Sequence, residues 1–121
     1  MRSRIIAAAF PFVLTACATS EVDLSRDPEP IQMEQWTQRI IANYPSRALR
    51  QELEGKVGLV VTVGQNGRVT ACRIARSSGF PILDDAARGG MVRYARFEPA
   101  LGRSGNPTVG GWSINIAYEI N

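Results

Sequence analysis

The chain has 121 residues with a formal net charge of +3, two cysteines and no histidine. This length is sufficient for one domain with a modest hydrophobic core. The absence of histidine removes the commonest general base and the commonest metal ligand, so the composition argues against a hydrolase and against a metal site.

Residues 1–16 have the layout of a secretory signal peptide, in which a segment with two arginines precedes an apolar run. The run at 5–14 is shorter than the roughly 20 residues of a membrane-spanning helix, and it contains Pro11. The sequence LTAC at 14–17 resembles the lipobox of bacterial lipoproteins, in which the chain is cut before the cysteine and the cysteine is acylated. We therefore expect Cys17 to carry a lipid anchor. An ordinary cleaved signal peptide and a structural N-terminus are the alternatives.

Residues 17–30 are polar and acidic and end in two prolines, which predicts an extended tether ahead of a domain at 31–121. Removal of residues 1–16 takes two arginines away and lowers the net charge from +3 to +1, so the charge gives no reason to expect nucleic acid as a ligand. If Cys17 is acylated, Cys72 is the only thiol left and no intramolecular disulfide is expected.

Two helices are predicted at the start of the domain. The first covers 31–42 and ends ahead of Pro45; its apolar residues at roughly helical spacing are Met33, Trp36, Ile40 and Ile41. The second is short and covers 47–54, with Ser46 expected as its N-cap and Gly55 as its C-cap.

A β-hairpin is predicted next. Residues 56–63 alternate between apolar and other side chains, and the Asn-Gly pair at 66–67 is a strong hairpin signal before a return strand at 68–76. Val69 is out of phase with Cys72 and Ile74, so a bulge near 70–71 is expected to turn all three toward the core. Cys72 is then a small buried hydrophobic residue rather than a reactive thiol.

A third helix and a final strand complete the predicted fold. Pro81 suits the first turn of a helix, Asp84 and Asp85 are expected to cap it, and its apolar stripe is Leu83, Ala86, Ala87, Met91, Val92 and Tyr94 or Ala95. The two glycines at 89–90 cost about 1–2 kcal/mol relative to alanine, and close packing on the sheet is the one reason we can give. A polar loop at 102–111 precedes an alternating strand at 112–120. The order α-β-β-α-β predicts a two-layer α+β fold, with a three-stranded antiparallel-type sheet and helices on one face.

The groups that could suggest catalysis have simpler explanations. Ser77 and Ser78 have no histidine to activate them, so a turn ahead of the helix is expected there. Asp84 and Asp85 are adjacent on a helix and point about 100° apart, so they do not form a catalytic pair. We therefore expect no enzymatic activity, no cofactor and no metal.

The terminal strand is the feature best suited to binding. A three-stranded sheet has two edges of unpaired amides, and residues 112–120 contain no proline and a single acid. One side of the strand is expected to present Trp112, Ile114, Ile116, Tyr118 and Ile120, and the other Ser113, Asn115, Ala117 and Glu119. The functional interpretation is that this edge accepts a partner strand. The alternative is that the edge stays unpaired and has no role in binding.

Several motifs in order resemble the C-terminal domain of TonB over residues 43–121: YPSRA (44–48), EGKVGLVVTV (54–63), NGRV (66–69), SSG (77–79), LD (83–84), RFEPA (96–100) and SINIAYEIN (113–121). The resemblance implies a periplasmic, non-enzymatic domain that pairs its terminal strand with a short peptide of a transporter, the TonB box. The peptide-binding residues implied here are Asn43, Tyr44, Trp112, Ser113, Asn115, Ala117 and Glu119. Asn43 stands where TonB has glutamine.

The resemblance also implies partners and a location. The partner would be a TonB-dependent outer-membrane receptor or another envelope protein, and the lipid anchor would hold the domain at the periplasmic side of a membrane. Ala18 after Cys17 favours the outer membrane, by resemblance to the sorting rule of enteric bacteria. One alternative is a component of TonB-dependent transport that works beside a separate motor protein. Another is a structural envelope lipoprotein without a transport role, and a homodimer remains open.

Overall fold

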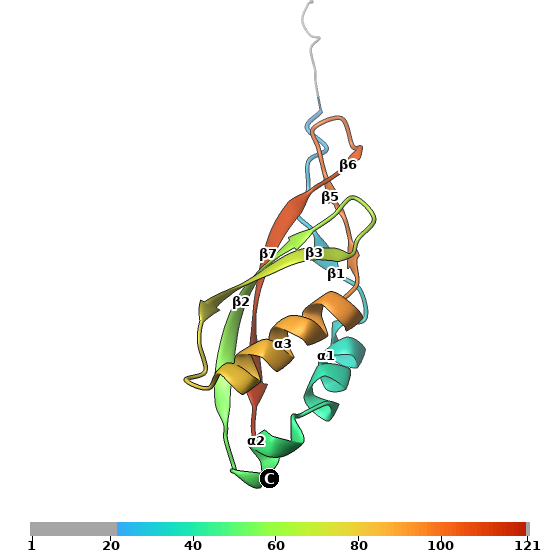
Figure 1. The fold of residues 1–121 in the computed structure, drawn as a ribbon. Helices are drawn as coiled ribbons and strands as arrows, with labels where there is room; N and C mark the ends of the chain where they lie inside the picture. Colours follow the sequence, from blue (N-terminus) through green and yellow to red (C-terminus); the bar gives the residue numbers. More distant parts are fainter. Residues whose placement is uncertain (1–21, 121) are drawn as a thin grey trace, which may run out of the picture.

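The computed structural model describes residues 22–120 as a three-stranded antiparallel sheet with helices on one face (Figure 1). The strand order is β3-β2-β7, so the middle strand is the first of the predicted hairpin and the terminal strand lies at an edge. The predicted α+β arrangement is confirmed. The principal elements are α1 (Met33–Ala42), α2 (Ser46–Arg50), β2 (Gly55–Val63), β3 (Val69–Arg76), α3 (Pro81–Tyr94) and β7 (Gly110–Tyr118).

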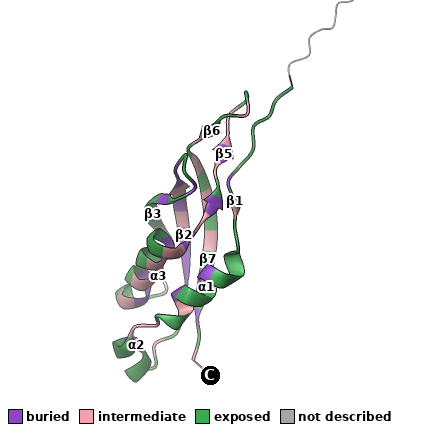
Figure 2. Ribbon diagram, turned by 90° about the vertical axis from the view of Figure 1, so that its right-hand side faces the viewer, coloured by how far each residue is buried: buried purple, intermediate pink, exposed green. Residues whose placement is uncertain are grey.

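The core lies between the sheet and the helices, because β2 turns every second side chain toward them. The buried members of β2 on this face are Val57, Leu59, Val61 and Val63. The helices contribute Trp36 and Ile40 from α1 and Leu83, Ala87 and Met91 from α3. Figure 2 shows that α1 and α2 are largely exposed on their outer sides. Met33 and Val92, predicted to belong to the apolar stripes, are exposed.

The predicted bulge in the return strand is confirmed. Thr62 pairs with Ala71 and Val63 with Val69, so Thr70 is the extra residue. Val69 is buried, and Cys72 and Ile74 are half-buried against the same core. A second register shift, between Gly58 and Leu59, was not predicted.

The ends of the helices differ from the prediction. The helix α2 stops at Arg50, four residues early, and Gly55 begins β2 instead of capping a helix. Ser46 is the first helical residue, after Pro45, and makes no cap hydrogen bond. The chain leaves this helix through Glu52, whose positive φ of 55° makes the turn that was assigned to glycine.

Residues 24–30, expected to be part of an extended tether, lie alongside the chain that follows α3. Strand β1 (Glu29–Pro30) pairs with β4 (Phe97–Glu98), and the Leu24 N–H donates to the Arg103 carbonyl at 3.0 Å. The segment predicted as a loop at 102–111 contains β6 (Pro107–Thr108), which pairs with β5 (Ala100–Leu101), and the first residues of β7. Among residues 22–120, no helix is both long and apolar enough to span a membrane.

Candidate functional site

Strand β7 has one backbone edge that no strand of residues 22–120 pairs with. It pairs with β2 over nine residues, from Tyr118 opposite Gly55 to Gly110 opposite Val63, without a register shift. Within residues 22–120, β7 pairs with no strand besides β2. Its other side therefore has amide and carbonyl groups that no strand of the described chain satisfies.

The hydrogen bonds of the hairpin show which backbone groups of β7 face outward. The Gly64 N–H donates to the Arg68 carbonyl, so Gly64 faces β3, and alternation turns the odd-numbered residues of β2 toward β7. Their partners in β7 are the even-numbered residues. Consistently, the N–H of Ile120 donates to the Glu54 carboxylate at 2.7 Å, on the β2 side. The N–H groups of Ser113, Asn115 and Ala117 therefore point to the free edge.

The side chains of β7 alternate as predicted. Ile116 and Tyr118 are buried, while Ser113, Asn115, Ala117 and Glu119 are exposed. Trp112, assigned to the peptide-binding set, faces inward: its ring lies 5.0 Å from that of Phe97 and 6.4 Å from that of Trp36. Gly111 is exposed on the outward side. The sequence analysis placed Gly111 in the loop at 102–111 and so left it out of the strand. Extending the two-residue alternation back from Ser113 would have placed Gly111 on the outward side.

Tyr44 packs against the buried end of β7. Its ring meets that of Tyr118 edge-on, with centroids 5.1 Å apart, and its hydroxyl donates to the Leu53 carbonyl. The pKa of Tyr44 is raised, mainly by burial and to a smaller extent by the negative charge of the Glu54 carboxylate. The pKa of Tyr118 is raised to about 12, mainly by burial and to a smaller extent by the nearby Tyr44. The Tyr118 hydroxyl is buried and has no hydrogen-bond partner among the described residues.

The side chain of Asn43 points away from this edge. The Asn43 amide donates to the Arg39 carbonyl and to the Tyr94 hydroxyl, both at 3.0 Å, so its side chain is held against α3. The structure thus brings Tyr44 to β7 and turns Asn43 toward the other helix. Cys17 lies outside the described residues.

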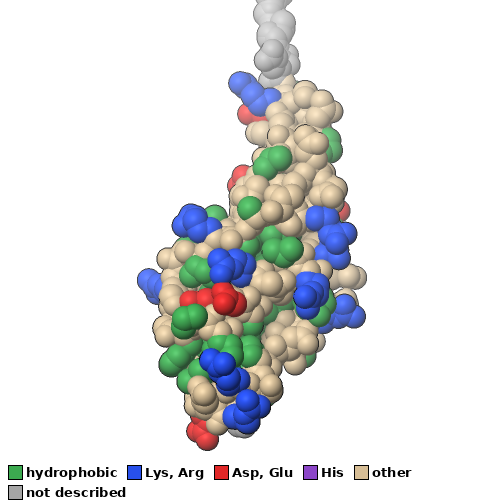
Figure 3. Space-filling model, viewed as in Figure 1, with side chains coloured by type: hydrophobic (Ala, Val, Ile, Leu, Met, Phe, Trp, Pro, Cys, Tyr) green, Lys and Arg blue, Asp and Glu red, His purple; other side chains and the backbone are tan. Residues whose placement is uncertain are grey.

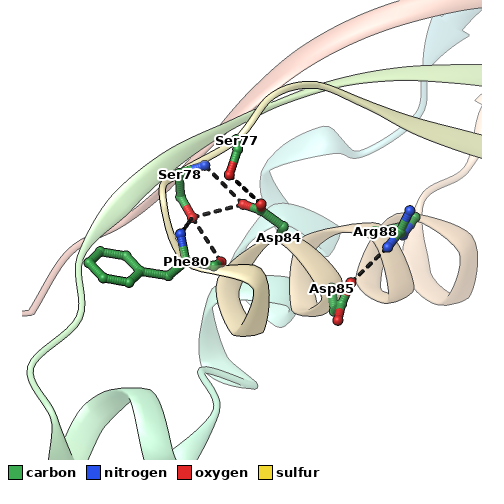
Figure 4. Close-up of polar contacts among 6 residues, drawn as sticks. All are labelled: Ser77, Ser78, Phe80, Asp84, Asp85 and Arg88. Atoms are coloured by element: carbon green, nitrogen blue, oxygen red, sulfur yellow. Dashed lines mark hydrogen bonds and ion pairs between the residues drawn. The ribbon is translucent and has the colours of Figure 1, made fainter.

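The groups considered for catalysis form a structural turn (Figure 4). The buried Asp84 carboxylate accepts hydrogen bonds from the Ser77 hydroxyl (2.5 Å), the Ser78 N–H (2.9 Å) and the Ser78 hydroxyl (2.8 Å). Asp84 thus ties the preceding turn to α3, and no side chain caps the helix at Phe80, which corrects the capping prediction. Burial alone would raise the pKa of Asp84, but the serine hydrogen bonds outweigh it and hold that pKa below its ordinary value. Asp85 pairs with Arg88 on the surface.

The one described thiol and the acidic side chains give no sign of a reactive or metal centre. Cys72 is half-buried, and burial raises the pKa of its thiol more than Arg88 lowers it. A raised pKa keeps the thiol protonated and unreactive. Among residues 22–120, no group of three or more potential metal-ligating side chains comes together.

Comparison with known proteins identifies the domain. Residues 42–120 match the family model described as Gram-negative bacterial TonB protein C-terminal. A segment of 79 residues, 64% of this chain, is 35% identical to Protein tonB2 of Pseudomonas aeruginosa, and it spans only 28% of that protein.

Solved structures share the fold. The solution structure of the Pseudomonas aeruginosa TonB C-terminal domain superposes with a TM-score of 0.56 at 22% identity, covering 78% of this chain and 88% of that one. The solution structure of the Helicobacter pylori TonB C-terminal domain superposes with a TM-score of 0.52 at 23% identity. It covers 73% of this chain and 80% of that one.

Proposed function

Because the chain belongs to the family of Gram-negative bacterial TonB C-terminal domains, a family of non-enzymatic domains, we propose that it binds an extended peptide of an envelope protein along β7. One observation carries the proposal: the outer edge of β7 is unpaired in the described chain, and the N–H groups of Ser113, Asn115 and Ala117 point toward it. Strand addition to such an edge uses main-chain hydrogen bonds for affinity.

The side chains of β7 fit this use. Ser113, Asn115 and Ala117 are small or medium-sized and exposed, so they leave room for a neighbouring strand. Each main-chain hydrogen bond contributes about 0.5–1.5 kcal/mol net, so a few of them alone support weak, reversible binding. Tyr44 contributes indirectly, by packing on Tyr118 beneath the edge.

The proposed partner is the peptide segment of a TonB-dependent outer-membrane receptor, or of another envelope protein. In the same proposal Cys17 carries the lipid anchor after removal of residues 1–16. Residues 17–30 then connect that anchor to the binding domain at the periplasmic side of a membrane, the outer membrane being favoured.

Amide-shift titration of the purified protein with a TonB-box peptide tests the binding site. We expect shifts to cluster on 111–119 and near Tyr44. Asn115→Pro removes an outward N–H and leaves the β2 ladder paired, so it should weaken binding about tenfold, the equivalent of one main-chain hydrogen bond. Asn115→Ala is the matched control, because it loses the side chain but keeps the N–H.

Three results would count against peptide binding at β7. Shifts confined to the hairpin or to α3 would place the peptide elsewhere. No saturable shifts with any co-encoded receptor peptide would favour a structural envelope lipoprotein instead. Shifts on β7 that grow with protein concentration alone would indicate that a second copy occupies the edge.

Lipid attachment is tested separately by fatty-acid labelling and membrane fractionation. Cys17→Ala should abolish the label and release the protein from membranes, because alanine has no thiol to which the lipid can be attached and the protein then lacks the acyl chains that anchor it. Equal labelling of Cys17→Ala and the parent protein would disprove attachment at this residue, without bearing on the β7 edge.

A further inference from the structure

A cavity of about 680 Å³ lies where one side of α1, the end of α3 and the turn between β2 and β3 come together. Three arginines from different parts of the chain line it: Arg39 of α1, Arg93 of α3, and Arg96 just after α3. In the view of Figure 3, several basic side chains lie on the right-hand side, at the level where α3 ends in Figure 1, and others lie elsewhere on the same face. No residue of β7 lines this cavity.

The three guanidinium groups are held in place by defined contacts. Those of Arg39 and Arg93 lie 5.5 Å and 5.9 Å from the centre of the Tyr94 ring. Tyr94 is in turn fixed by the hydrogen bond from Asn43 to its hydroxyl. Arg96 donates from Nη1 to the Ala95 carbonyl at 2.8 Å. The Tyr94 ring therefore lies beside two of the cavity's arginines, and the backbone carbonyls of Arg93 and Ala95 hold the third.

No acidic side chain of the described residues forms an ion pair with these three arginines. No aspartate or glutamate lines the cavity. The ion pairs found among residues 22–120 join Asp85 with Arg88 and Asp23 with Arg103, and none includes the three cavity arginines.

We infer that this cavity binds a phosphate ester. Guanidinium groups match the oxygens of phosphate in bidentate geometry, and a phosphate group offers more acceptor oxygens to three arginines than a carboxylate does. The cavity is larger than a phosphate group, and the amide side chains of Gln35 and Asn66 also line it, so they can hydrogen-bond the organic part of the ligand. The ester can come from a soluble sugar phosphate or from a lipid headgroup, which present the same chemistry.

The test is an amide-shift titration of the full chain with inorganic pyrophosphate at constant ionic strength. We expect saturable shifts at Arg39, at 66–67 and at 93–97. Arg39→Gln and Arg96→Gln should each weaken binding about tenfold, while Arg47→Gln and Arg50→Gln, which remove the same charge from the exposed α2, should not. Circular dichroism of each variant verifies the fold. Arg39→Lys keeps the positive charge but loses the paired N–H donors of the guanidinium group, so it should also bind more weakly.

Two further probes separate the sources. Displacement of pyrophosphate by glucose 6-phosphate would assign a soluble ester, and displacement by monomeric dihexanoyl phosphatidic acid would assign a lipid headgroup. The inference is overturned if pyrophosphate gives no saturable shifts, if acetate gives the same shifts, or if the α2 variants weaken binding as much as the cavity variants. None of these results depends on peptide binding at β7.

Discussion

Gly90 of α3 and Ile40 of α1 are in such close contact that a Cβ added to Gly90 would lie 2.8 Å from Cγ1 of Ile40. The helices can approach this closely only because residue 90 has no side chain. Gly89, its neighbour, faces open space. Of the two glycines, Gly90 thus allows close contact between α3 and α1. The sequence analysis had instead expected the pair to pack closely on the sheet.

Gly90→Ala should destabilise the domain by about 1–3 kcal/mol, because overpacking the contact with Ile40 outweighs the gain in helix propensity. Gly89→Ala should stabilise it by about 0.5–1 kcal/mol, since nothing obstructs the added methyl. Urea unfolding of both variants measures the difference. Equal stability of the two would mean that α1 and α3 are not held at this distance.

Asp84→Asn should destabilise the domain by about 2–4 kcal/mol near neutral pH, because the buried carboxylate accepts hydrogen bonds from Ser77 and Ser78. The pKa of Asp84 is lowered by folding, so its charged form stabilises the fold above the unfolded value of about 4. This stabilisation is lost as the pH falls through the lower folded pKa. Thermal unfolding between pH 2 and 7 should therefore show the two proteins converging in acid.

Asp85→Asn is the control for that experiment. Its ion pair with Arg88 is exposed, so the change should alter stability by no more than about 0.5 kcal/mol. A difference between Asp84→Asn and the parent protein that stays constant down to pH 2 would contradict the role assigned to the charge.

Tyr118→Phe should stabilise the domain by about 1–2 kcal/mol, because it removes a buried hydroxyl that has no partner among residues 22–120. Tyr44→Phe should destabilise it by about 1 kcal/mol, since it loses the hydrogen bond to the Leu53 carbonyl. Chemical unfolding at pH 7 compares the two. A loss of stability in Tyr118→Phe would show that its hydroxyl has a partner, such as a buried water.

Tyr118 should also make the stability of the fold sensitive to alkaline pH. The pKa of Tyr118 is about 12 in the folded chain and about 10 when unfolded, so folding favours the protonated form. Its contribution is complete below pH 10 and is lost as the pH rises toward 12. Unfolding curves over this range should fall less steeply for Tyr118→Phe, and parallel curves would contradict the raised pKa.

Cys72 should react slowly with a thiol reagent in the folded protein, because it is half-buried and burial raises the pKa of its thiol. The matched control is Ala71→Cys in a Cys72→Ala background, which moves the thiol to the exposed neighbouring position. We expect labelling of Cys72 at least tenfold slower than of the control, and equal rates once both are denatured. Equal rates in the native state would mean that β3 does not turn Cys72 toward the core.

Much of the secondary structure could be predicted because its causes are local. Alternation in 56–63 and in 112–120 places side chains on two faces of a strand, and the glycine after Asn66 closes the hairpin. The phase slip at Val69 was sufficient to predict the extra residue at Thr70. These are properties of neighbouring residues, and the tertiary structure preserved them.

The sequence alone therefore determined the alternation of β7, its freedom from proline and the resemblance that names the family. Only the tertiary structure decided that β2 is the central strand, which leaves β7 at an edge, and which of its amides face outward. It also decided that Asn43 turns to Tyr94 and that Arg39, Arg93 and Arg96 share one cavity. Such relationships depend on how helices and strands distant in sequence pack together, and the spacing of residues along the chain carries no information about distance across the core.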